Sequence, residues 1–502
     1  MNTKLLKQKI LNLAIRGKLT DQRKSDGTAR ELLEQISASR QPERSTKSAK
    51  SKNLGTITPL DKNEDLFEIP NNWEWVKLGD VCEVLNGDRG SNYPSKKDYL
   101  SEGIPFINAG CLEDGFIDYS KAHFISNKKY ESLRAGKIQK HDILYCLRGS
   151  LGKCGIVPNA EQGAISSSLC IFRLHLSIVK PQYILYYIQS SCVKSQQLFV
   201  DNGTAQPNLS ARDVANYALP LPPLAEQHRI VEKIEEAFTE IDAVEKNKEL
   251  LKTHIKQTRQ KILDLAIHGK LVPQDENDEP ASVLLEKILQ EKAQSDNKKH
   301  SKKNKTTTPA TSDNRPYEKI ENIPFEIPEN WMWVRLGDLS KTIQYGYNAP
   351  AKESGRIKMV RISDIYENEI VWDTVPFCDI EDDEIPTYLL KKNDILFART
   401  GGTVGKSYIV DNLPEESVYA GYLILTRYGE NINAHYMKYF MESGLYWEQL
   451  REGCIATAQP NCNGKTLGKM RIPLPPINEQ FRIVSKIEES FSALDQMERN
   501  LI

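Results

Sequence analysis

The sequence lacks the short motifs by which many enzymes are identified. Its 502 residues contain no Asn-Pro-Pro-aromatic or Asp-Pro-Pro-aromatic tetrad, no GxGxxG after a predicted strand, no HExxH and no GxSxG. The eight histidines are dispersed along the chain. Because a single-chain methyltransferase or nuclease should display cofactor or metal motifs, we expect no catalytic residues and no metal site here.

Paired cysteines, long apolar runs and a secretory leader are missing as well. The nine cysteines form no CxxC and no paired Cys/His cluster, so we expect neither disulfides nor structural zinc. No apolar run approaches the length that a bilayer span needs. The first residues, MNTKLLKQKI, lack the apolar core and cleavage site of a signal peptide. These absences predict a cytoplasmic protein without a membrane partner.

Net charge is also nearly absent, since 67 basic residues face 68 acidic ones. This balance does not indicate a nucleic-acid-binding protein, so any such surface would have to be local. Apolar residues make up 39% of the chain and charged residues 27%, as in an ordinary soluble protein. A chain of 502 residues is too long for one core, which suggests two or three domains.

A long helix over residues 220–271 is the clearest pattern that is present. Apolar residues recur from Ile230 onward at alternating steps of four and three, and only Lys248 and Thr258 interrupt the series. This spacing, without an internal proline or glycine, is typical of a two-stranded coiled coil. At 1.5 Å per residue, the span 226–267 would be roughly 63 Å long. Such a helix would act as a spacer with a domain at each end.

Both halves of this helix occur a second time, at the two ends of the chain. KILNLAIRGKL at 9–19 matches KILDLAIHGKL at 261–271 in nine of eleven positions. PLPPINEQFRIVSKIEESF at 473–491 matches PLPPLAEQHRIVEKIEEAF at 220–238 in fourteen of nineteen. The chain is therefore a circularly permuted tandem repeat. In the simplest packing, the central helix lies antiparallel to a composite of the C-terminal and N-terminal helices, with a pseudo-two-fold axis between the halves and the termini nearly meeting.

We therefore expect an α+β protein with two mixed α/β domains separated by a long antiparallel two-helix coiled coil. The predicted parts are an N-terminal helical piece (1–19), a flexible basic linker (20–64), a first domain (65–223), the central helix (224–271), a helix remnant with a second basic linker (272–322), a second domain (323–476) and a C-terminal helix (477–502). The most linker-like stretches, 37–53 and 292–308, are rich in serine and basic residues, and transient phosphate contact is the alternative to a solvated linker.

Each domain opens with a shared sequence, FEIPNNWEWVKLGD at 67–80 and FEIPENWMWVRLGD at 325–338. Paired tryptophans among alternating apolar positions predict a first strand that packs into the domain core. We expect scaffold roles for Trp73, Trp75, Trp331 and Trp333. Further strands are predicted at 104–108, 143–147, 170–174, 359–362, 395–398 and 422–426, and helices at 181–199 and 434–451.

Between these shared pieces, one loop differs strongly between the domains. It reads NGDRGSNYPSKKDY at 86–99 and QYGYNAPAK at 344–352. Glycine, asparagine, tyrosine and basic side chains suit close backbone approach, hydrogen bonds to base edges and phosphate contact, whereas ordinary turns are the alternative. A duplicated framework with unlike loops is what recognition of two different targets in one geometry requires.

A glycine-rich turn after a strand is the second candidate, DILYCLRGSLGK at 142–153 and DILFARTGGTVGK at 394–406. It misses a phosphate-binding P-loop, because the first glycine would have to stand at Thr400 and Cys154 stands where serine or threonine is needed. We expect a hairpin whose basic side chains face a polyanion, with a purely structural hairpin as the alternative. The acidic run DIEDDE at 379–384 is expected to be a solvated loop that faces away from nucleic acid, not a metal site.

Taken together, these features resemble the specificity subunit of a type I restriction-modification system over nearly the whole chain. The resemblance rests on the two domains, the PLPPL-x-EQ-x-x-IV helix start, the Ala-Gln-Pro-Asn turns at 205–208 and 458–461, the glycine-rich DIL hairpin and the permuted helical repeats. It implies a non-catalytic subunit that binds double-stranded DNA at a bipartite target, each recognition domain reading one half. It also implies two modification subunits that methylate adenine N6 with S-adenosylmethionine, and restriction subunits that use ATP and Mg²⁺, with no cofactor in this chain.

For DNA contact, the resemblance and the loops favour ten residues: Arg89, Tyr93, Lys96, Arg148 and Lys153 for one half-site, and Tyr345, Tyr347, Asn348, Arg399 and Lys406 for the other. A helix of roughly 63 Å would limit the separation of the half-sites to about 18 base pairs at 3.4 Å per pair. The alternative is a coiled-coil adaptor that presents two protein-binding domains. It explains the helix and the duplication, but not why the loops differ while the frameworks agree.

Overall fold

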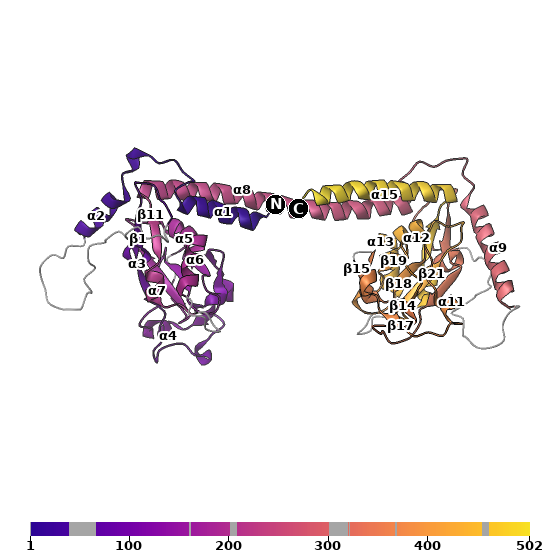
Figure 1. Ribbon diagram of the computed structural model, residues 1–502, viewed down its shortest axis with the longest axis horizontal. Helices are drawn as coiled ribbons and strands as arrows, with labels where there is room; N and C mark the ends of the chain where they lie inside the picture. The colour runs from indigo at the N-terminus through magenta and orange to yellow at the C-terminus, as the bar shows by residue number, and fades with distance from the viewer. Residues whose placement is uncertain are drawn as a thin grey trace. The chain divides into compact units, whose positions relative to one another are not determined.

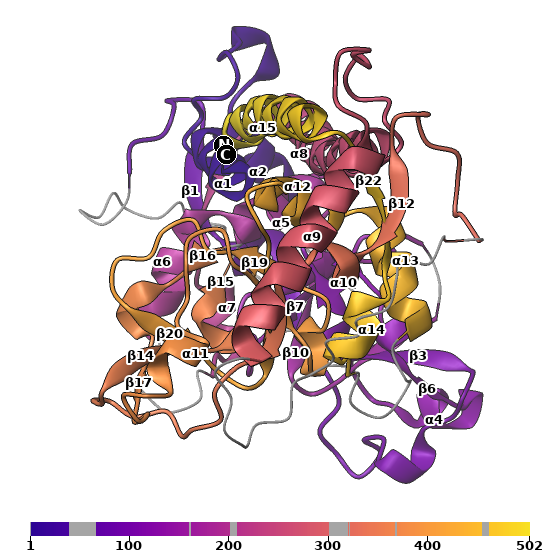
Figure 2. The same ribbon diagram turned by 90° about the vertical axis from the view of Figure 1, so that its right-hand side faces the viewer.

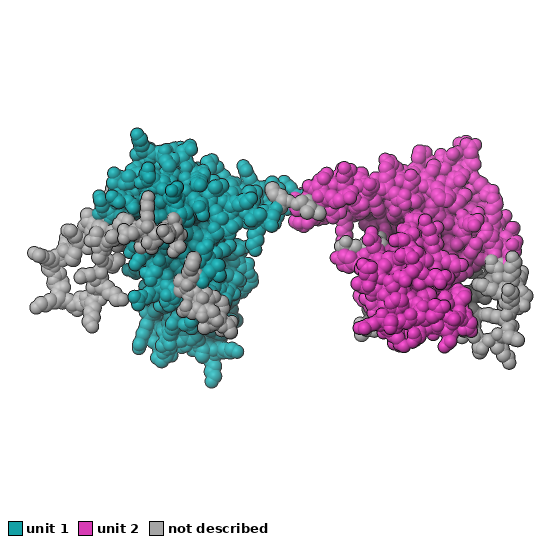
Figure 3. Space-filling model, in the orientation of Figure 1, with its two compact units in different colours: residues 1–247 teal, residues 248–502 magenta. Residues whose placement is uncertain are grey.

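The chain forms two compact units with separate cores, Met1–Asn247 (unit 1) and Lys248–Ile502 (unit 2) (Figure 3). The structure is a computed structural model. It describes residues 2–39, 67–159, 162–200, 208–300, 320, 322–366, 369–453 and 461–501. The Ala-Gln-Pro-Asn turns lie outside these residues except for Asn208 and Asn461.

Unit 1 is a mixed α/β domain whose elements follow in this order: α1 (Thr3–Ile15), η1 (Lys24–Asp26), α2 (Ala29–Ser39), β1 (Glu74–Lys77), α3 (Leu78–Val81), β2 (Cys82–Asn86), η2 (Lys96–Asp98), β3 (Ile104–Ile107), η3 (Ala109–Cys111), β4 (Leu112–Glu113), β5 (Phe116–Ile117), η4 (Tyr119–Lys121), β6 (His123–Ile125), α4 (Asn127–Ser132), β7 (Ile143–Cys146), β8 (Cys154–Ile156), β9 (Ala164–Ile165), β10 (Leu169–Leu174), α5 (Pro181–Gln189), α6 (Ser191–Val200), α7 (Ala211–Ala215), β11 (Ala218–Leu221) and the first part of α8 (Leu224–Ile267).

Unit 2 repeats this order after the second part of α8: α9 (Ala281–His300), β12 (Met332–Arg335), α10 (Leu336–Leu339), β13 (Thr342–Tyr345), β14 (Ile357–Val360), η5 (Ile362–Asp364), β15 (Ile365–Tyr366), β16 (Glu369–Ile370), η6 (Trp372–Thr374), β17 (Phe377–Cys378), α11 (Ile385–Tyr388), β18 (Ile395–Ala398), η7 (Gly401–Thr403), β19 (Ser407–Ile409), β20 (Ser417–Tyr419), β21 (Leu423–Arg427), α12 (Ala434–Phe440), α13 (Gly444–Gly453), α14 (Gly464–Gly468), β22 (Arg471–Leu474) and α15 (Ile477–Arg499).

Both units have the same sheet topology. A four-stranded antiparallel sheet runs β2-β10-β7-β8 in unit 1 and β13-β21-β18-β19 in unit 2. A three-stranded sheet with one parallel pair runs β6-β3-β9 and β17-β14-β20, and a ribbon pairs β1 with β11 and β12 with β22. The predicted mixed, mostly antiparallel α+β framework is confirmed.

The central strand of each large sheet is buried on both faces. In β7, Ile143 and Tyr145 belong to one apolar cluster, and Leu144 and Cys146 belong to another. Its counterpart β18 divides its four residues between two clusters in the same way. This two-sided burial explains why the sequence shows a continuous apolar run there instead of an alternating pattern.

Helix α8 extends continuously over 44 residues, as the apolar spacing predicts. In unit 1 it packs against α1, where Lys7 pairs with Asp242. In unit 2 it packs against α15, where Arg259 pairs with Asp495 (Figure 1). The stretch 220–271 first assigned to this helix was too wide at both ends, whereas the predicted domain bound at residue 224 coincides with the observed start. At the first end, residues 218–221 form a strand that pairs with β1, and Pro220, Pro222 and Pro223 disfavour helix before Leu224. At the second end, Gly269, at φ +67°, follows the last helical residue.

The predicted apolar seam is buried toward both ends of α8 but not at its middle. Ile230, Ile234 and Ile255 are buried, whereas Val244 and Leu251 are 48% and 40% exposed. The reason is that α1 begins at residue 3 and α15 ends at residue 499, so each partner helix stops near these positions of its own unit. The seam prediction was therefore wrong at the centre.

Other differences from the predicted elements are small. The predicted helices 181–199 and 434–451 are each broken into two, α5 with α6 and α12 with α13. Helices α2 and α9 (Figure 2) extend into stretches predicted as linkers. Lys292 of α9 donates to the Gly337 carbonyl at 2.6 Å. Within the described ranges, no helix combines the length and apolar character of a membrane span.

Candidate nucleic-acid interface

A buried glutamate joins the residue just before the first strand of each unit to the start of a long helix. Trp73 donates its indole N–H to Glu226 Oε2 at 2.9 Å, and Trp331 does the same to Glu479 Oε2 at 2.8 Å. Gln274 also donates to Glu479, at 2.5 Å. Burial raises the pKa of Glu479, although these two hydrogen bonds act against the rise.

The tryptophans thus serve as scaffold, as the sequence predicts. The second pair of tryptophans is buried as well, with Trp75 edge-on against Phe67 and Trp333 edge-on against Phe325, both at 4.9 Å between ring centroids.

The glutamine that follows each glutamate fixes the chain around the helix start. Gln227 Nε2 donates to the Ile178 carbonyl at 2.8 Å, and its Oε1 accepts from the Lys180 N–H at 2.8 Å. In unit 2, Gln480 Oε1 accepts from the Asn433 N–H at 2.9 Å. The repeated Glu-Gln pair is therefore explained by packing, not by ligand binding.

The aspartate that opens each glycine-rich hairpin is also structural. Asp142 receives two guanidinium hydrogen bonds from Arg173, at 2.8 and 3.2 Å, and Asp394 receives two from Arg427, both at 2.6 Å. Both carboxylates are buried. These contacts fix the base of the hairpin. They could not be predicted from local pattern, because the arginines lie on the neighbouring strand but 31 and 33 positions further along the chain.

In unit 1, three segments meet at the end of the four-stranded sheet. The Leu147 N–H donates to the Ser168 carbonyl at 2.9 Å, which joins the hairpin to the turn before β10. Arg148 Nε donates to Asn208 Oδ1 at 2.9 Å, and Arg89 reaches the Ser167 carbonyl at 3.5 Å. We call Arg89, Arg148, Ser168 and Asn208 the unit 1 corner.

The same backbone contacts recur in unit 2. The Arg399 N–H donates to the Tyr422 carbonyl at 3.2 Å, and Thr400 forms a β-bridge with Asn461, as Arg148 does with Asn208. By these bonds Arg399 corresponds to Leu147, and Thr400 to Arg148. The unit 2 corner comprises Asn348, Arg399, Thr400, Tyr422 and Asn461.

The predicted contact residues divide into two groups. The exposed ones are Arg89, Lys96, Arg148, Lys153, Asn348 and Lys406, and the half-buried ones are Tyr93, Tyr345, Tyr347 and Arg399. The structure brings Arg89 and Arg148 together in one corner, and Asn348 and Arg399 in the other. Lys96 lies outside the corner as defined, in the short helix η2.

The half-buried tyrosines contribute to the protein framework. Tyr93 packs edge-on against Phe106 at 5.6 Å between centroids. The Tyr345 hydroxyl accepts from the Gly464 N–H at 2.9 Å, and its ring lies 4.6 Å below the guanidinium of Arg399. DNA contact by these side chains stays a prediction.

The acidic run contacts the unit 2 loop, and its predicted orientation away from nucleic acid stays a prediction. Asp379 pairs with Lys352, and Asp382 Oδ1 accepts from Arg356 Nε at 2.8 Å. The Tyr347 hydroxyl donates to Glu384 at 3.3 Å. The run is exposed for most of its length. Among the described residues, no group of three or more potential ligands is placed to hold a metal ion.

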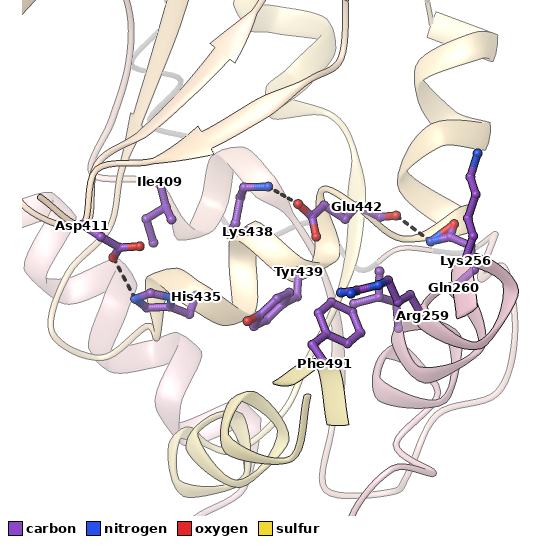
Figure 4. Close-up of a pocket in the computed structure, with 11 residues that line it drawn as sticks. Lys256, Arg259, Gln260, Ile409, Asp411, His435, Lys438, Tyr439, Glu442 and Phe491 are labelled. Atoms are coloured by element: carbon purple, nitrogen blue, oxygen red, sulfur yellow. Dashed lines mark hydrogen bonds and ion pairs between the residues drawn. The ribbon is translucent and has the colours of Figure 1, made fainter. Parts of the chain in front are cut away.

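Unit 2 also contains a cavity of about 500 Å³, lined by residues of α8, α12 and α15 and the end of β19 (Figure 4). His435 Nε2 lies 3.2 Å from Asp411, and Lys438 pairs with Glu442. Arg259 lies 4.9 Å from the Phe491 ring centroid. His435 and Lys438 each lie beside a carboxylate and Arg259 beside an aromatic ring, and none of the lining residues belongs to the unit 2 corner. The cavity therefore lies at a joint between the domain and its helices.

The comparisons with known proteins agree over nearly the whole chain. The family described as "Type I restriction modification DNA specificity domain" matches residues 70–253 and 328–502. The type I restriction enzyme EcoEI specificity subunit of Escherichia coli is 27% identical, over 99% of this chain and 90% of that protein. The EcoAI specificity subunit of the same species is 26% identical, over 98% and 90%.

Solved structures show the same fold at lower identity. The crystal structure of the HsdS subunit from Thermoanaerobacter tengcongensis gives a TM-score of 0.54 at 18% identity and covers 87% of this chain and 95% of its own. A structure of a type I R-M system, described by its complex assembly and conformational transition, gives 0.58 at 18% identity, over 87% and 94%.

Proposed function

Because this chain belongs to the family of type I restriction-modification DNA specificity subunits, we propose that its two corners read the two halves of a bipartite DNA target. The unit 1 corner would contact one half-site and the unit 2 corner the other. Recognition, and not the chemical step, is the role of this chain. Support comes from the two family matches, one of which lies mainly in each unit.

The observation that carries the proposal is one backbone framework with unlike side chains at its tip. Gly87 and Gly346 follow equivalent strands, and a Cβ at either would overlap carbonyl oxygens of the neighbouring turn. Two residues further on, unit 1 presents Arg89 and unit 2 presents Asn348. An arginine is suited to guanine O6 and N7, whereas an asparagine is suited to adenine N6 and N7. A protein-binding adaptor would need no such divergence at matched positions.

The remaining predicted residues suit positioning on the phosphate backbone. Lys153 and Lys406 are exposed at equivalent ends of the two hairpins, and Arg148 is exposed beside Asn208. Cations in such places bind phosphates and fix the register without reading sequence. Lys96 would extend this contact in unit 1. The ten proposed DNA contacts also include four half-buried residues that pack within the loops: Tyr93, Tyr345, Tyr347 and Arg399.

We further propose that two modification subunits bind this chain and methylate adenine N6 with S-adenosylmethionine, and that restriction subunits using ATP and Mg²⁺ join them. The helix pairs α1 with α8 and α15 with α8 carry the same sequence repeat. They therefore offer two equivalent surfaces, one for each modification subunit. The 44-residue α8, roughly 66 Å at 1.5 Å per residue, would set the gap between the half-sites.

The test is to co-express the chain with the candidate methyltransferase subunit and to sequence the methylated adenines in the host DNA. We expect a split motif with a gap of fixed length. Exchange of loop 86–99 for that of another specificity subunit should change one half of the motif and leave the other half unchanged. If a stable complex forms but no adenine methylation depends on this chain, the adaptor function replaces the proposed one.

A further inference from the structure

Tyr422 is an exposed aromatic residue in the unit 2 corner that the sequence patterns did not single out. Its side chain is 64% exposed, although it stands directly before the buried strand β21. A tyrosine ring that faces water gives up the free energy that burial of its apolar area would provide. An exposed ring at this place is therefore a candidate for coverage by a ligand.

The backbone that carries Tyr422 is fixed by three hydrogen bonds. Its carbonyl accepts from the Arg399 N–H at 3.2 Å, the Gly421 N–H donates to the Tyr347 carbonyl at 2.8 Å, and the Leu423 N–H donates to the Ala420 carbonyl at 2.9 Å. A contact group held in this way loses little backbone entropy when it binds a partner. Arg399 and Asn348, two predicted DNA contacts, lie next to this turn.

Unit 1 has the same turn with a different side chain. Ser168 corresponds to Tyr422, because its carbonyl accepts from the Leu147 N–H at 2.9 Å. Its hydroxyl lies 2.8 Å from the Ser166 hydroxyl, within the turn itself. One backbone position thus presents a large exposed ring in unit 2 and a small, internally bonded hydroxyl in unit 1.

We propose that position 422, with its counterpart 168, determines base specificity, and that the Tyr422 ring contacts the apolar edge of one base pair, of which the thymine methyl group is the chemical example. This inference rests on the proposed function. The ring is the contacting part in this inference, because its apolar area is left in water in the unbound protein and would be covered by the base edge. Apolar contact with the thymine methyl group is an established way of reading the major groove.

The experiment uses the full chain with its modification subunits. It measures methylation of DNA targets in which every base pair of each half-site is replaced in turn by the other base pairs. Tyr422→Ser should reduce discrimination at one base pair of the unit 2 half-site by roughly tenfold, with the unit 1 half-site unchanged. Tyr422→Phe should behave as the parent protein. Tyr366→Ser is the matched control, since Tyr366 is 66% exposed in the same unit but lies on β15, and it should change neither half-site.

Two results would overturn the inference. If Tyr422→Ser discriminates between base pairs as the parent protein does, Tyr422 takes no part in recognition. If Tyr422→Phe loses as much base-pair discrimination as Tyr422→Ser does, the hydroxyl makes the contact. Thermal unfolding of each variant shows whether a loss arises from misfolding. Exchange of loop 86–99 separates this inference from the proposed function: if that exchange alters the motif while Tyr422→Ser does not, only the inference fails. If methylation does not depend on the chain at all, the proposed function fails.

Discussion

Trp331 and Glu479, 148 positions apart in the sequence, share a buried hydrogen bond of 2.8 Å that joins the residue before strand β12 to helix α15. Trp73 and Glu226 form its equivalent in unit 1, at 2.9 Å. The repeat of this contact shows that the duplicated sequence encodes a duplicated joint between domain and helix. Such a joint holds the recognition loops in a defined position relative to the helix of their own unit.

Glu479→Gln should change how the stability of the protein depends on pH. Burial raises the pKa of Glu479, so the folded state binds a proton more tightly than the unfolded state does. The contribution of this group therefore falls as pH rises from its ordinary pKa of about 4.5 through the raised value. Glutamine carries no titrating proton and still accepts a hydrogen bond from Trp331. As pH rises through this range, the variant should therefore become more stable relative to the parent protein. Thermal unfolding at a series of pH values measures the difference.

Glu489→Gln is the control for that experiment, because Glu489 lies on the same helix and its side chain is 71% exposed. Its pH profile should follow that of the parent. A constant offset between Glu479→Gln and the parent at every pH would show that Glu479 has an ordinary pKa in the folded protein.

Asp394→Asn should destabilise the protein by about 3 kcal/mol, because it leaves Arg427 without its buried carboxylate. The two side chains share two hydrogen bonds of 2.6 Å, and Asp394 is 1% exposed. Denaturant unfolding measures the loss. Asp382→Asn is the control, since that carboxylate is 78% exposed and its pair with Arg356 should contribute little. Equal losses in the two variants would contradict the structural role of the buried pair.

Gly269→Ala should lower the melting temperature. Gly269 has φ +67°, and an added Cβ would overlap the ring of Pro328. An alanine must therefore adopt a left-handed backbone and displace a neighbour, at a cost of about 1 kcal/mol or more. Gly17 is its equivalent in unit 1, at φ +65° beside Pro70, and should respond in the same way. Gly444→Ala, at a helical glycine with open space around its Cβ, should not lower the melting temperature.

The sequence repeats made the two domains and the long helix predictable. Features that depend on contacts between distant parts of the chain could not be predicted. Strand 395–398 and the scaffold role of Trp331 followed from local pattern, because apolar runs and tryptophans have few alternatives to burial. Residues 220 and 221 were included in the helical stretch but form part of a strand, because they pair with β1, a contact that local pattern does not show. The predicted domain bound at residue 224 coincides with the observed helix start. Arg399 stands opposite Leu147, because both lie five positions after the aspartate of the DIL sequence, and the backbone bonds agree with this alignment. The structural role of these bonds could not be predicted, because Ser168 and Tyr422 lie far along the chain.

Lys406→Ala should weaken DNA binding by the assembled complex evenly across target sequences. An exposed lysine at the hairpin end is expected to neutralise a phosphate, which carries no sequence information. The slope of log affinity against log salt should fall by about one. Lys287→Ala, at an exposed position of α9 where the lysine pairs with Glu279, is the control and should leave the slope unchanged. A change in base preference with an unaltered slope would instead assign Lys406 to base contact.

Insertion of seven residues after Asn247 of α8 should lengthen the gap between the two half-sites. Seven residues keep the apolar positions of the helix in phase and add about 10 Å, which corresponds to about three base pairs. Val244 and Leu251, on either side of the insertion, are only partly covered, so the packing of α8 on α1 and on α15 should be preserved in each unit. Sequencing of methylated adenines gives the new gap directly. A variant with the residues around Asn247 replaced at constant length is the control and should keep the original gap. If the lengthened helix also keeps it, α8 does not determine the spacing, and the gap must be set by the modification subunits.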